Sequence, residues 1–246
     1  MSATPLLEID GLSVSFGAGG REVKAVQGAS LGIDKGETVA LVGESGSGKS
    51  VTALSVLQLL PYPSAWHPQG SIRFAGEELM GAGEARLRDL RGDRIAMIFQ
   101  EPLTSLNPLH SVERQISEVL LVHKLMGREK ARRRAIELLR LVGLAEATER
   151  LHALPYEFSG GQQQRIMIAM ALANEPDLLI ADEPTTAVDV TIQAQLLKLL
   201  KDLQAELGMA LLLITHDLGI VRRMSERVYV MNAGRIVEQG KVADIF

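Results

Sequence analysis

The stretch Gly43-Glu44-Ser45-Gly46-Ser47-Gly48-Lys49-Ser50 fits the spacing G-x-x-x-x-G-K-[ST]. It lies between an apolar run, Thr38 to Val42, and a helix-like run, Val51 to Leu60. Glycines in such a stretch let consecutive backbone N–H groups point at a polyphosphate, which a Cβ atom would obstruct. The N-terminus of the following helix adds positive charge. The pattern therefore predicts a strand, a phosphate-binding loop and a helix. The alternative is an ordinary Gly/Ser-rich surface turn.

Two side chains of this stretch have roles in nucleotide chemistry. Lys49 is placed to reach the β- and γ-phosphates as a point charge, and the Ser50 hydroxyl is placed to bind Mg²⁺, the counter-ion of the nucleotide. A strand before the loop and a helix after it are the context that this interpretation requires.

Composition limits the class of protein. With 246 residues and 46% apolar content, the chain can form one large α/β domain, or a core with a smaller inserted subdomain. The formal charge of −4 gives no overall attraction for nucleic acid, and the lack of cysteine excludes disulfides. No apolar run approaches the ~18 residues of a membrane span, and the N-terminus does not resemble a signal peptide. We therefore expect a soluble, cytoplasmic protein that could bind a membrane protein.

The pattern of apolar residues predicts the elements around the loop. Near-alternation from Leu7 to Phe16 and the run from Val23 to Ile33 favour an antiparallel β segment. Short, wholly apolar runs are typical of strands buried on both faces of a parallel sheet. Runs of this kind are Thr38–Val42, Leu178–Ala181 and Ala210–Thr215, and Arg94–Phe99 is a similar run that begins with an arginine. A further strand, Gly70–Phe74, is expected after a proline-rich break, and a closing hairpin is expected from Val228–Met231 and Arg235–Glu238. The expected helices are Glu84–Leu90, Gln162–Asn174 and Val190–Leu207. The segment Ser111–Leu151 is also expected to be helical, with breaks at Gly127 and Gly143.

Polar residues follow four of the buried strands. They are the loop Gly43–Ser50, then Gln100, then Asp182 and Glu183, then His216. Parallel strands bring these ends to one edge of a sheet. That edge would hold a phosphate cradle, a neutral ligand for Mg²⁺ or water, two carboxylates and an imidazole near the γ-phosphate. These are the parts needed for phosphoryl transfer to water.

The two carboxylates are expected to have different roles. Asp182 follows four apolar residues and is the predicted Mg²⁺ ligand, whereas Glu183 would polarise the attacking water. The alternative for this pair is a plain turn at the end of a strand. The alternative for His216 is a core or helix-capping histidine. His67, His110, His123 and His152 lack the spacing of metal ligands and are expected to be structural or surface residues.

A second anion-binding end is predicted at Ser159-Gly160-Gly161-Gln162, which opens a helix. One nucleotide does not need two such ends. Either Ser159 is an ordinary helix cap, or this end meets the nucleotide of another subunit. The basic run Arg128 to Arg134 could contact nucleic acid, but without interleaved aromatic residues a solvated helix face is favoured.

Taken together, these motifs resemble the ATP-binding cassette of ABC transporters, along essentially the whole chain. Gly43–Ser50 is similar to Walker A, Gln100 to the Q-loop, Phe158–Gln162 to the family signature, Leu178–Asp182 to Walker B, Thr186–Asp189 to the D-loop and His216 to the switch histidine. The signature usually begins with Leu where Phe158 stands, and the D-loop has Leu where Val188 stands. Both exchanges are apolar and leave the polar groups in place.

The resemblance implies a P-loop NTPase (RecA-like) α/β core with an N-terminal antiparallel β subdomain and an inserted α-helical subdomain. It implies one domain over residues 1–246, with core in 1–100 and 155–246 and the helical subdomain in 101–154. It implies Glu183, His216, Lys49 and Gln100 as catalytic residues and Ser50, Gln100 and Asp182 as Mg²⁺ ligands. ATP would be bound by Gly43, Glu44, Ser45, Gly46, Ser47, Gly48, Lys49, Ser50 and Val51, by Ser159, Gly161 and Gln162 of a second cassette, and by Phe16 stacked on adenine. The alternative for Phe16 is a core residue of the first strand.

The subgroup is also indicated. Gln100 to Pro108 and Asp182 to Thr191 are similar to the oligopeptide and dipeptide importers, and Arg94 to Pro108 with Ile166 to Ala171 resemble the double-cassette ATPases of microcin C and oligopeptide uptake. The chain is then expected to be the first half of a longer polypeptide or a shortened form of one.

That resemblance implies an ATPase on the inner face of the cell membrane. Its expected partners are a second cassette, integral membrane permease subunits and, indirectly, a substrate-binding protein, with no nucleic acid. The alternatives are a non-transport cassette ATPase acting on ribosomes or DNA, and a nucleotide-responsive module without turnover.

Overall fold

The computed structural model describes residues 4–18, 21–100, 105–185 and 188–246. The chain divides into two compact units. Unit 1 comprises Met1–Arg88 and Gly208–Phe246, and unit 2 comprises Asp89–Leu207. This division differs from the predicted boundaries of the helical subdomain, 101–154, which stay a prediction. Helix α2 (Glu84–Leu90) contains residues of both units.

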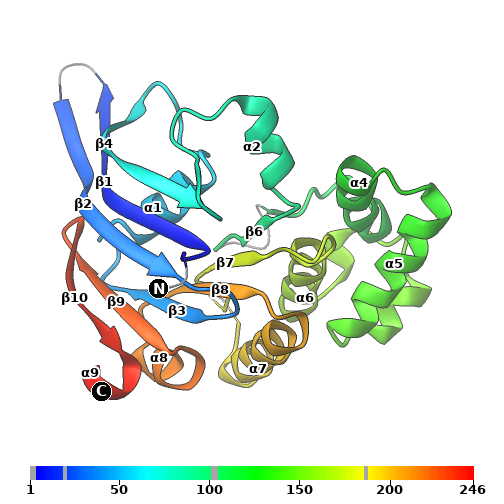
Figure 1. Cartoon of the computed structure of the whole chain (residues 1–246). Coiled ribbons are helices and arrows are strands. Elements are labelled where there is room, and N and C mark those ends of the chain that lie inside the picture. Colours follow the sequence, from blue (N-terminus) through cyan, green and yellow to red (C-terminus); the bar gives the residue numbers. More distant parts are fainter. Residues whose placement is uncertain (1–3, 19–20, 101–104, 186–187) are drawn as a thin grey trace. The chain divides into compact units, whose positions relative to one another are not determined.

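Unit 1 contains an antiparallel sheet of four strands in the order β2-β1-β4-β5. Strands β1 (Leu7–Ala18) and β2 (Arg21–Ile33) form the long hairpin drawn in blue in Figure 1. Strand β4 (Ala65–Phe74) pairs with β1, and β5 (Glu77–Glu78) pairs with the end of β4. The apolar side chains of the alternating pattern are buried, including Leu7, Ile9 and Leu12. The predicted antiparallel β segment is therefore present.

Unit 1 also contains four further paired strands, in the order β10-β9-β3-β8. Strand β3 (Thr38–Val42) is parallel to β8 (Ala210–Thr215) and to β9 (Arg227–Asn232), and β10 (Arg235–Lys241) closes an antiparallel hairpin with β9. Every residue of β3 and β8 is buried, as expected for strands covered on both faces. The helices of this part are α1 (Lys49–Val56), α8 (Leu218–Met224) and α9 (Val242–Ile245).

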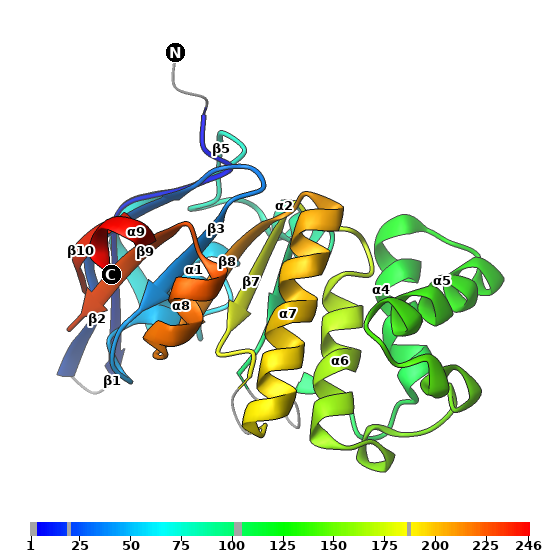
Figure 2. The same cartoon turned by 90° about the horizontal axis from the view of Figure 1, so that it is seen from below.

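Unit 2 contains the parallel strands β6 (Ile95–Ile98) and β7 (Leu178–Asp182) and most of the helices. Figure 2 shows α6 (Gly160–Ala171) and α7 (Val190–Leu207) side by side next to β7, with α4 (Val112–Lys124) and α5 (Arg128–Leu141) beyond α6. Two short 3₁₀ turns, Ala145–Glu149 and Pro155–Glu157, connect α5 to α6. The predicted breaks are confirmed, since Gly127 is the N-cap of α5 and Gly143, at φ +74°, follows its end.

Helices α1 and α8 and strand β4 differ from the predictions. Helix α1 covers Lys49–Val56, not 51–60. Strand β4 begins at Ala65, not Gly70, and includes Pro68. The register between β1 and β4 shifts between the pairs Ser13↔Gln69 and Ser15↔Trp66, so Pro68 lies at an irregularity where a missing N–H is tolerated. Helix α8 was not predicted, although Asp217 caps it by accepting hydrogen bonds from the Gly219 and Ile220 N–H groups.

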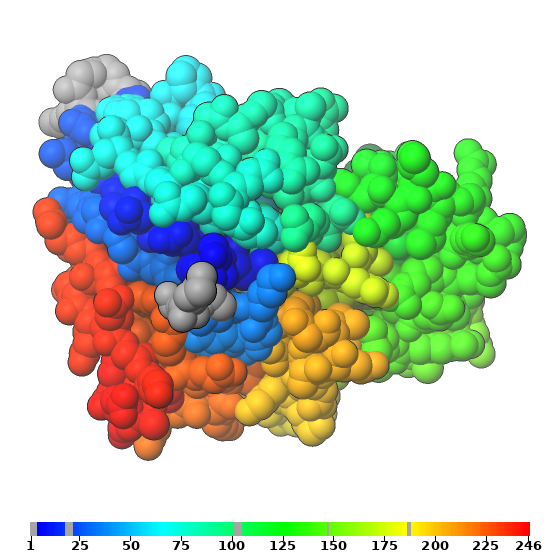
Figure 3. All heavy atoms as spheres, viewed as in Figure 1, coloured from blue at the N-terminus to red at the C-terminus, as the bar shows by residue number. Residues whose placement is uncertain are grey.

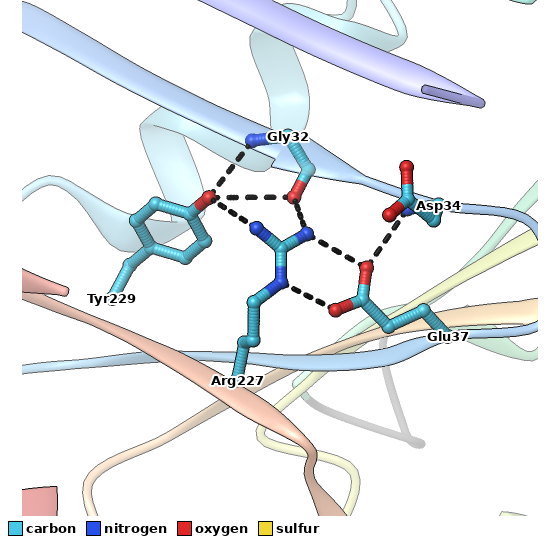
Figure 4. A network of polar contacts seen from close by, with 5 residues as sticks. All are labelled: Gly32, Asp34, Glu37, Arg227 and Tyr229. Carbon is cyan, nitrogen blue, oxygen red and sulfur yellow. Dashed lines mark hydrogen bonds and ion pairs between the residues drawn. The ribbon is translucent and has the colours of Figure 1, made fainter. Parts of the chain in front are cut away.

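A polar network fixes β9 to the end of β2 (Figure 4). The Arg227 guanidinium donates through Nε and Nη2 to both carboxylate oxygens of Glu37, the second at 2.7 Å, and through Nη2 to Gly32 O at 2.8 Å. The Gly32 N–H donates to the Tyr229 hydroxyl at 3.1 Å. The hydrogen bonds to Glu37 raise the pKa of Arg227 further above its ordinary value. The network therefore pairs the Arg227 guanidinium with a buried carboxyl group.

We expect Arg227→Ala to lower the free energy of unfolding by about 2–3 kcal/mol, because the Glu37 carboxylate, only 10% exposed, would lose its bidentate partner. A matched control exists in the same unit. Arg86 forms a bidentate pair with Glu77 at 2.7 and 2.6 Å, but both side chains are 42% exposed. Arg86→Ala should cost about 1 kcal/mol or less. Chemical unfolding of both variants measures the difference in the free energy of unfolding. Equal losses would contradict the inference that the buried Glu37 carboxylate depends on Arg227 as its partner.

Candidate nucleotide site

The phosphate-binding loop follows β3 and leads into α1, as predicted. Its first glycine is required by packing, because a Cβ at Gly43 would lie 2.1 Å from the carbonyl oxygen of Met231 on β9. Gly48 has a φ of +106°, and a Cβ there would lie 2.6 Å from the carbonyl oxygen of Ala25 on β2. The glycines thus permit a close approach between the loop and two neighbouring strands. This is a reason for glycine beyond the access to phosphate that the sequence suggested.

Lys49 is inside the loop and is 5% exposed. Its Nζ donates to the carbonyl oxygens of Gly43 and Glu44, both at 2.9 Å, and lies 3.5 Å from the Ser47 hydroxyl. Gly48 is the N-cap of α1, and no side-chain hydrogen bond caps that helix end. The first N–H groups of α1 are therefore not capped by a side chain, which suits an anion.

The remaining loop residues differ in exposure. Ser47 is buried, Ser50 and Val51 are partly buried, and Glu44, Ser45 and Gly46 are exposed. The Lys49 ammonium is held by the backbone of the loop and lies beside the N-terminus of α1, which no side chain caps. This arrangement suits a polyphosphate. The plain surface turn does not explain a buried lysine.

Phe16 lies on β1, where it pairs with Val23 on β2 and Ala65 on β4. It is partly buried, whereas Ala65 is buried and Val23 is 62% exposed. Phe16 is therefore partly accessible on an inner strand of the sheet, and its stacking on adenine stays a prediction.

In unit 2 the structure brings Gln100 and Glu183 together. Gln100 follows β6 and Glu183 follows β7, and the Gln100 Nε2 donates to Glu183 Oε2 at 3.2 Å. Asp182 ends β7 and is 4% exposed, whereas Glu183 is only partly buried. These different surroundings agree with separate roles for the two carboxylates. The roles themselves stay predictions.

The backbone at Glu183 is held in an uncommon conformation, with φ at +45°. Gln164 of α6, 1% exposed, donates through Nε2 to the carbonyl oxygen of the next residue, Pro184. One residue further, the Thr185 hydroxyl accepts from Gln193 Nε2 of α7 at 3.1 Å. Two helices therefore fix the turn that carries Glu183. The sequence gives no local sign of either contact.

His216 follows β8 in unit 1 and is exposed. It is therefore not a core histidine, and the side chain that caps α8 belongs to Asp217. The Thr215 hydroxyl accepts from the Asp217 N–H at 3.1 Å, which fixes the turn after the strand. A role for His216 beside a γ-phosphate remains a prediction.

The predicted second anion end forms a capping box. The Ser159 Oγ accepts from the Gln162 N–H at 3.4 Å, and the Ser159 N–H donates to Gln162 Oε1 at 2.9 Å. Ser159 is therefore a helix cap. The same residues also line a hollow of about 440 Å³ with Gly161, Arg165, Asp189 and Ile192. Of the D-loop, Thr186 and Ala187 lie outside the described residues.

Comparison with known proteins agrees with these motifs. The model of the family described as ABC transporter matches residues 26–186. The chain is 59% identical over 242 residues to a "Peptidoglycan transport ATP-binding protein YejF" of Agrobacterium fabrum, covering 98% of this chain and 44% of that protein. It is 52% identical over 243 residues to the "Oligopeptide transport ATP-binding protein OppD" of Bacillus subtilis, covering 99% of this chain and 68% of that protein. The chain thus spans less than half of the first relative.

Solved structures confirm the fold class. A dimeric, post-hydrolysis ATP-binding cassette, MJ0796, bound to ADP and Pi matches with a TM-score of 0.85 and 29% identity, over 96% of this chain and 98% of that one. The predicted α/β P-loop NTPase core with its β and helical parts is therefore correct. Within the described ranges, no helix combines the length and apolar character needed to cross a bilayer. The chain belongs to the ABC transporter family, as one of its ATP-binding cassettes.

Proposed function

We propose that this cassette binds MgATP and hydrolyses it. The observation that carries the proposal is the loop between β3 and α1, in which a buried lysine and an uncapped helix end surround a space suited to phosphate. The relative with ADP and Pi in its structure supports the same ligand class.

Each candidate residue has a defined task in this proposal. Lys49 and the N–H groups of the loop hold the phosphates and stabilise charge on the γ-phosphate as it transfers. Glu183 orients and deprotonates the attacking water, and Gln100 holds the Glu183 carboxylate in place through its amide. His216 is assigned to the γ-phosphate. Assigning these groups to one nucleotide rests on the sequence and on family membership.

Magnesium would neutralise the phosphate charge when it is bound with the nucleotide. The proposed ligands are the Ser50 hydroxyl, the Gln100 amide oxygen and the Asp182 carboxylate, all hard oxygen donors of the kind Mg²⁺ prefers. The Gln100 amide nitrogen donates to Glu183, which leaves its oxygen as the candidate ligand.

We further propose that two cassettes close head to tail on ATP. The capping box at Ser159 and the hollow beside Gly161 would then meet the nucleotide of a second cassette, which is either a second copy or another part of a longer polypeptide. ATP would favour the closed pair and hydrolysis would release it. The dimeric state of the structural relative supports this arrangement.

The transported substrate class is proposed from the relatives. Those at 50–59% identity are named for transport of peptidoglycan, oligopeptides and dipeptides. We therefore propose that this cassette powers peptide import, bound to permease subunits on the inner face of the cell membrane, with a substrate-binding protein as an indirect partner. A membrane-bound position follows from these partners and is not a property of the chain alone.

A ribosome- or DNA-acting ATPase is less well supported. The basic face of α5 is largely paired with acid: Arg132 with Glu113, Arg133 with Glu129, and Arg134 with Glu137 and Glu175. These pairs reduce the positive charge that a phosphate backbone would meet.

The test places a negative charge at the proposed second nucleotide contact. Ser159→Asp should keep the cap of α6, since Asp caps as well as Ser and suits the helix dipole, but should repel a phosphate of the opposing cassette. We expect MgATP hydrolysis to fall about tenfold or more, with little change in thermal stability. Phosphate release from purified protein is the measurement.

Ser111→Asp is the matched control. Ser111 caps α4 in the same unit, with its Oγ accepting from the Arg114 N–H at 3.3 Å. Its replacement should leave hydrolysis unchanged. If Ser159→Asp hydrolyses ATP like the control, the head-to-tail arrangement is wrong; if the unmodified protein releases no phosphate, the ATPase assignment itself is wrong.

A further inference from the structure

The turn between β9 and β10 touches the phosphate-binding loop. The Gly234 N–H donates to the carbonyl oxygen of Ser47 at 2.9 Å. On its other side, the Gly234 carbonyl oxygen accepts from the Gln27 N–H at 2.7 Å, and the Ala233 carbonyl oxygen accepts from Gln27 Nε2 at 3.0 Å. The turn therefore lies between the loop and β2. Figure 3 shows the outer surface of this region, where β2 in blue adjoins β9 and β10 in orange to red.

The geometry of the turn requires glycine. Ala233 and Gly234 both have positive φ, +45° and +81°. A Cβ at Gly234 would lie 2.9 Å from the Ala25 carbonyl oxygen and 3.3 Å from Val26 Cα. Because these are backbone atoms, they cannot turn aside as a side chain would. A side chain at this position would push the turn away from β2 and so change the geometry of its hydrogen bond to Ser47.

The hydrogen bond to Ser47 fixes an orientation inside the loop. The Ser47 carbonyl and the Gly48 N–H belong to one planar trans peptide, so they point in opposite directions. Holding the carbonyl towards the turn aims the Gly48 N–H away from it. Gly48 is also the N-cap of α1, so this peptide is where the loop becomes the helix.

Strand β9 supports both ends of the loop just before the turn begins. The Met231 carbonyl oxygen lies 2.1 Å from the position of a Cβ on Gly43, and the Met231 Cε lies 2.9 Å from that position on Gly48. At its beginning, β9 is fixed to β2 through Arg227. The strand and its turn therefore pack against the phosphate-binding loop and are themselves held in place by β2.

We propose that the turn Asn232-Ala233-Gly234 is a brace that holds the phosphate-binding loop in its anion-binding conformation, with Gly234 as a positioning residue. The proposal rests on the proposed binding of ATP by this loop. Gly234 touches no substrate and acts through the Ser47–Gly48 peptide.

The test compares two glycines in equivalent turns. Ala75 and Gly76 join β4 to β5 with φ values of +50° and +83°, nearly those of Ala233 and Gly234, but a Cβ at Gly76 meets no atom within 4 Å. Both Gly→Ala variants introduce the same kind of backbone strain, and only Gly234→Ala disturbs the loop. We expect the ATP dissociation constant to rise about ten- to hundredfold in Gly234→Ala and to stay unchanged in Gly76→Ala.

Two readouts separate bracing from general stability. The unfolding midpoint without nucleotide measures how much backbone strain each substitution adds. The ATP dissociation constant, measured at a temperature where both variants are folded, shows whether the phosphate-binding loop keeps its conformation. If Gly234→Ala binds ATP as tightly as Gly76→Ala, the brace is wrong. If the unmodified protein and Gly76→Ala do not bind ATP, the proposed function fails instead.

A second pair of variants covers the case in which Gly234→Ala does not fold. Gln27→Ala removes the side-chain hydrogen bond to Ala233 O and the one that Gln27 Oε1 accepts from Arg235 Nη2 at 3.0 Å. Gln69→Ala removes an exposed bond of the same kind, from Nε2 to the Ser13 hydroxyl at 3.3 Å. We expect Gln27→Ala to weaken ATP binding severalfold and Gln69→Ala to leave it unchanged. Equal affinity in this pair would likewise overturn the brace.

Discussion

Glu183→Gln is expected to abolish ATP turnover while leaving ATP binding intact. The amide keeps the size of the side chain and can still bond to Gln100, but it cannot accept a proton from water at neutral pH. Loss of a general base costs about 10²- to 10⁴-fold in rate. Single-turnover phosphate release and equilibrium ATP binding, measured on the same preparation, separate the two effects.

The same variant should accumulate a closed pair of cassettes with ATP. If ATP favours closure and hydrolysis reopens the pair, blocking hydrolysis leaves the closed form populated. Light scattering with and without MgATP measures this. Loss of turnover without any pairing would contradict the proposed head-to-tail closure of two cassettes. Normal turnover would contradict the proposed role of Glu183.

Glu175 provides a matched control for Glu183. Both residues are glutamates at positive φ, +54° and +45°, but Glu175 lies before β7, is exposed and pairs with Arg134 at 2.7 Å. Glu175→Gln should therefore keep full hydrolysis. A comparable loss in this variant would show that removing a glutamate charge from such a turn lowers the rate without any role in proton transfer.

The sequence predicted most of what depends on local pattern. The phosphate loop was found because its residues are contiguous, and the buried strands were found because their runs are wholly apolar. Gln100 and Glu183 are predicted at one sheet edge because both follow buried parallel strands, and the structure adds that these strands, β6 and β7, are adjacent. Helix α8 was missed although Asp217 is a good cap before an apolar segment, since seven residues give a weak periodic signal.

Contacts distant in sequence could not be predicted. The turn at Gly234 was expected as a hairpin, but its bond to Ser47 joins residues far apart along the chain. The same holds for Gln164, which fixes Pro184 from within a helix that looks purely structural. The reason for glycine at Gly43 also became visible only once β9 lay against the loop. The sequence indicated the candidate reacting groups, whereas the structure shows which contacts hold them in place.

Lys49→Met is expected to weaken nucleotide binding and to reduce turnover strongly. Methionine fills most of the space of the lysine stem in this buried position, but the ammonium that neutralises phosphate charge is lost. A hydrogen bond to a charged group contributes about 1.5–3 kcal/mol, so ATP affinity should fall about ten- to hundredfold. Calorimetric titration with MgATP measures this. Lys35→Met, in an exposed turn of the same unit, is the control and should bind ATP normally.

Mixing the purified Lys49→Met and Ser159→Asp proteins tests whether the two halves of the nucleotide site lie on different chains. Each variant alone should hydrolyse ATP about tenfold or more slowly than the unmodified protein. In a head-to-tail pair of copies, a mixed pair joins the intact phosphate loop of the Ser159→Asp chain to the intact helix end of the Lys49→Met chain, so mixing should recover part of the hydrolysis. If each chain used its own loop with its own Ser159, mixing would recover nothing, because neither chain carries both halves intact. Recovery on mixing would therefore place Lys49 and Ser159 on opposite sides of a shared nucleotide.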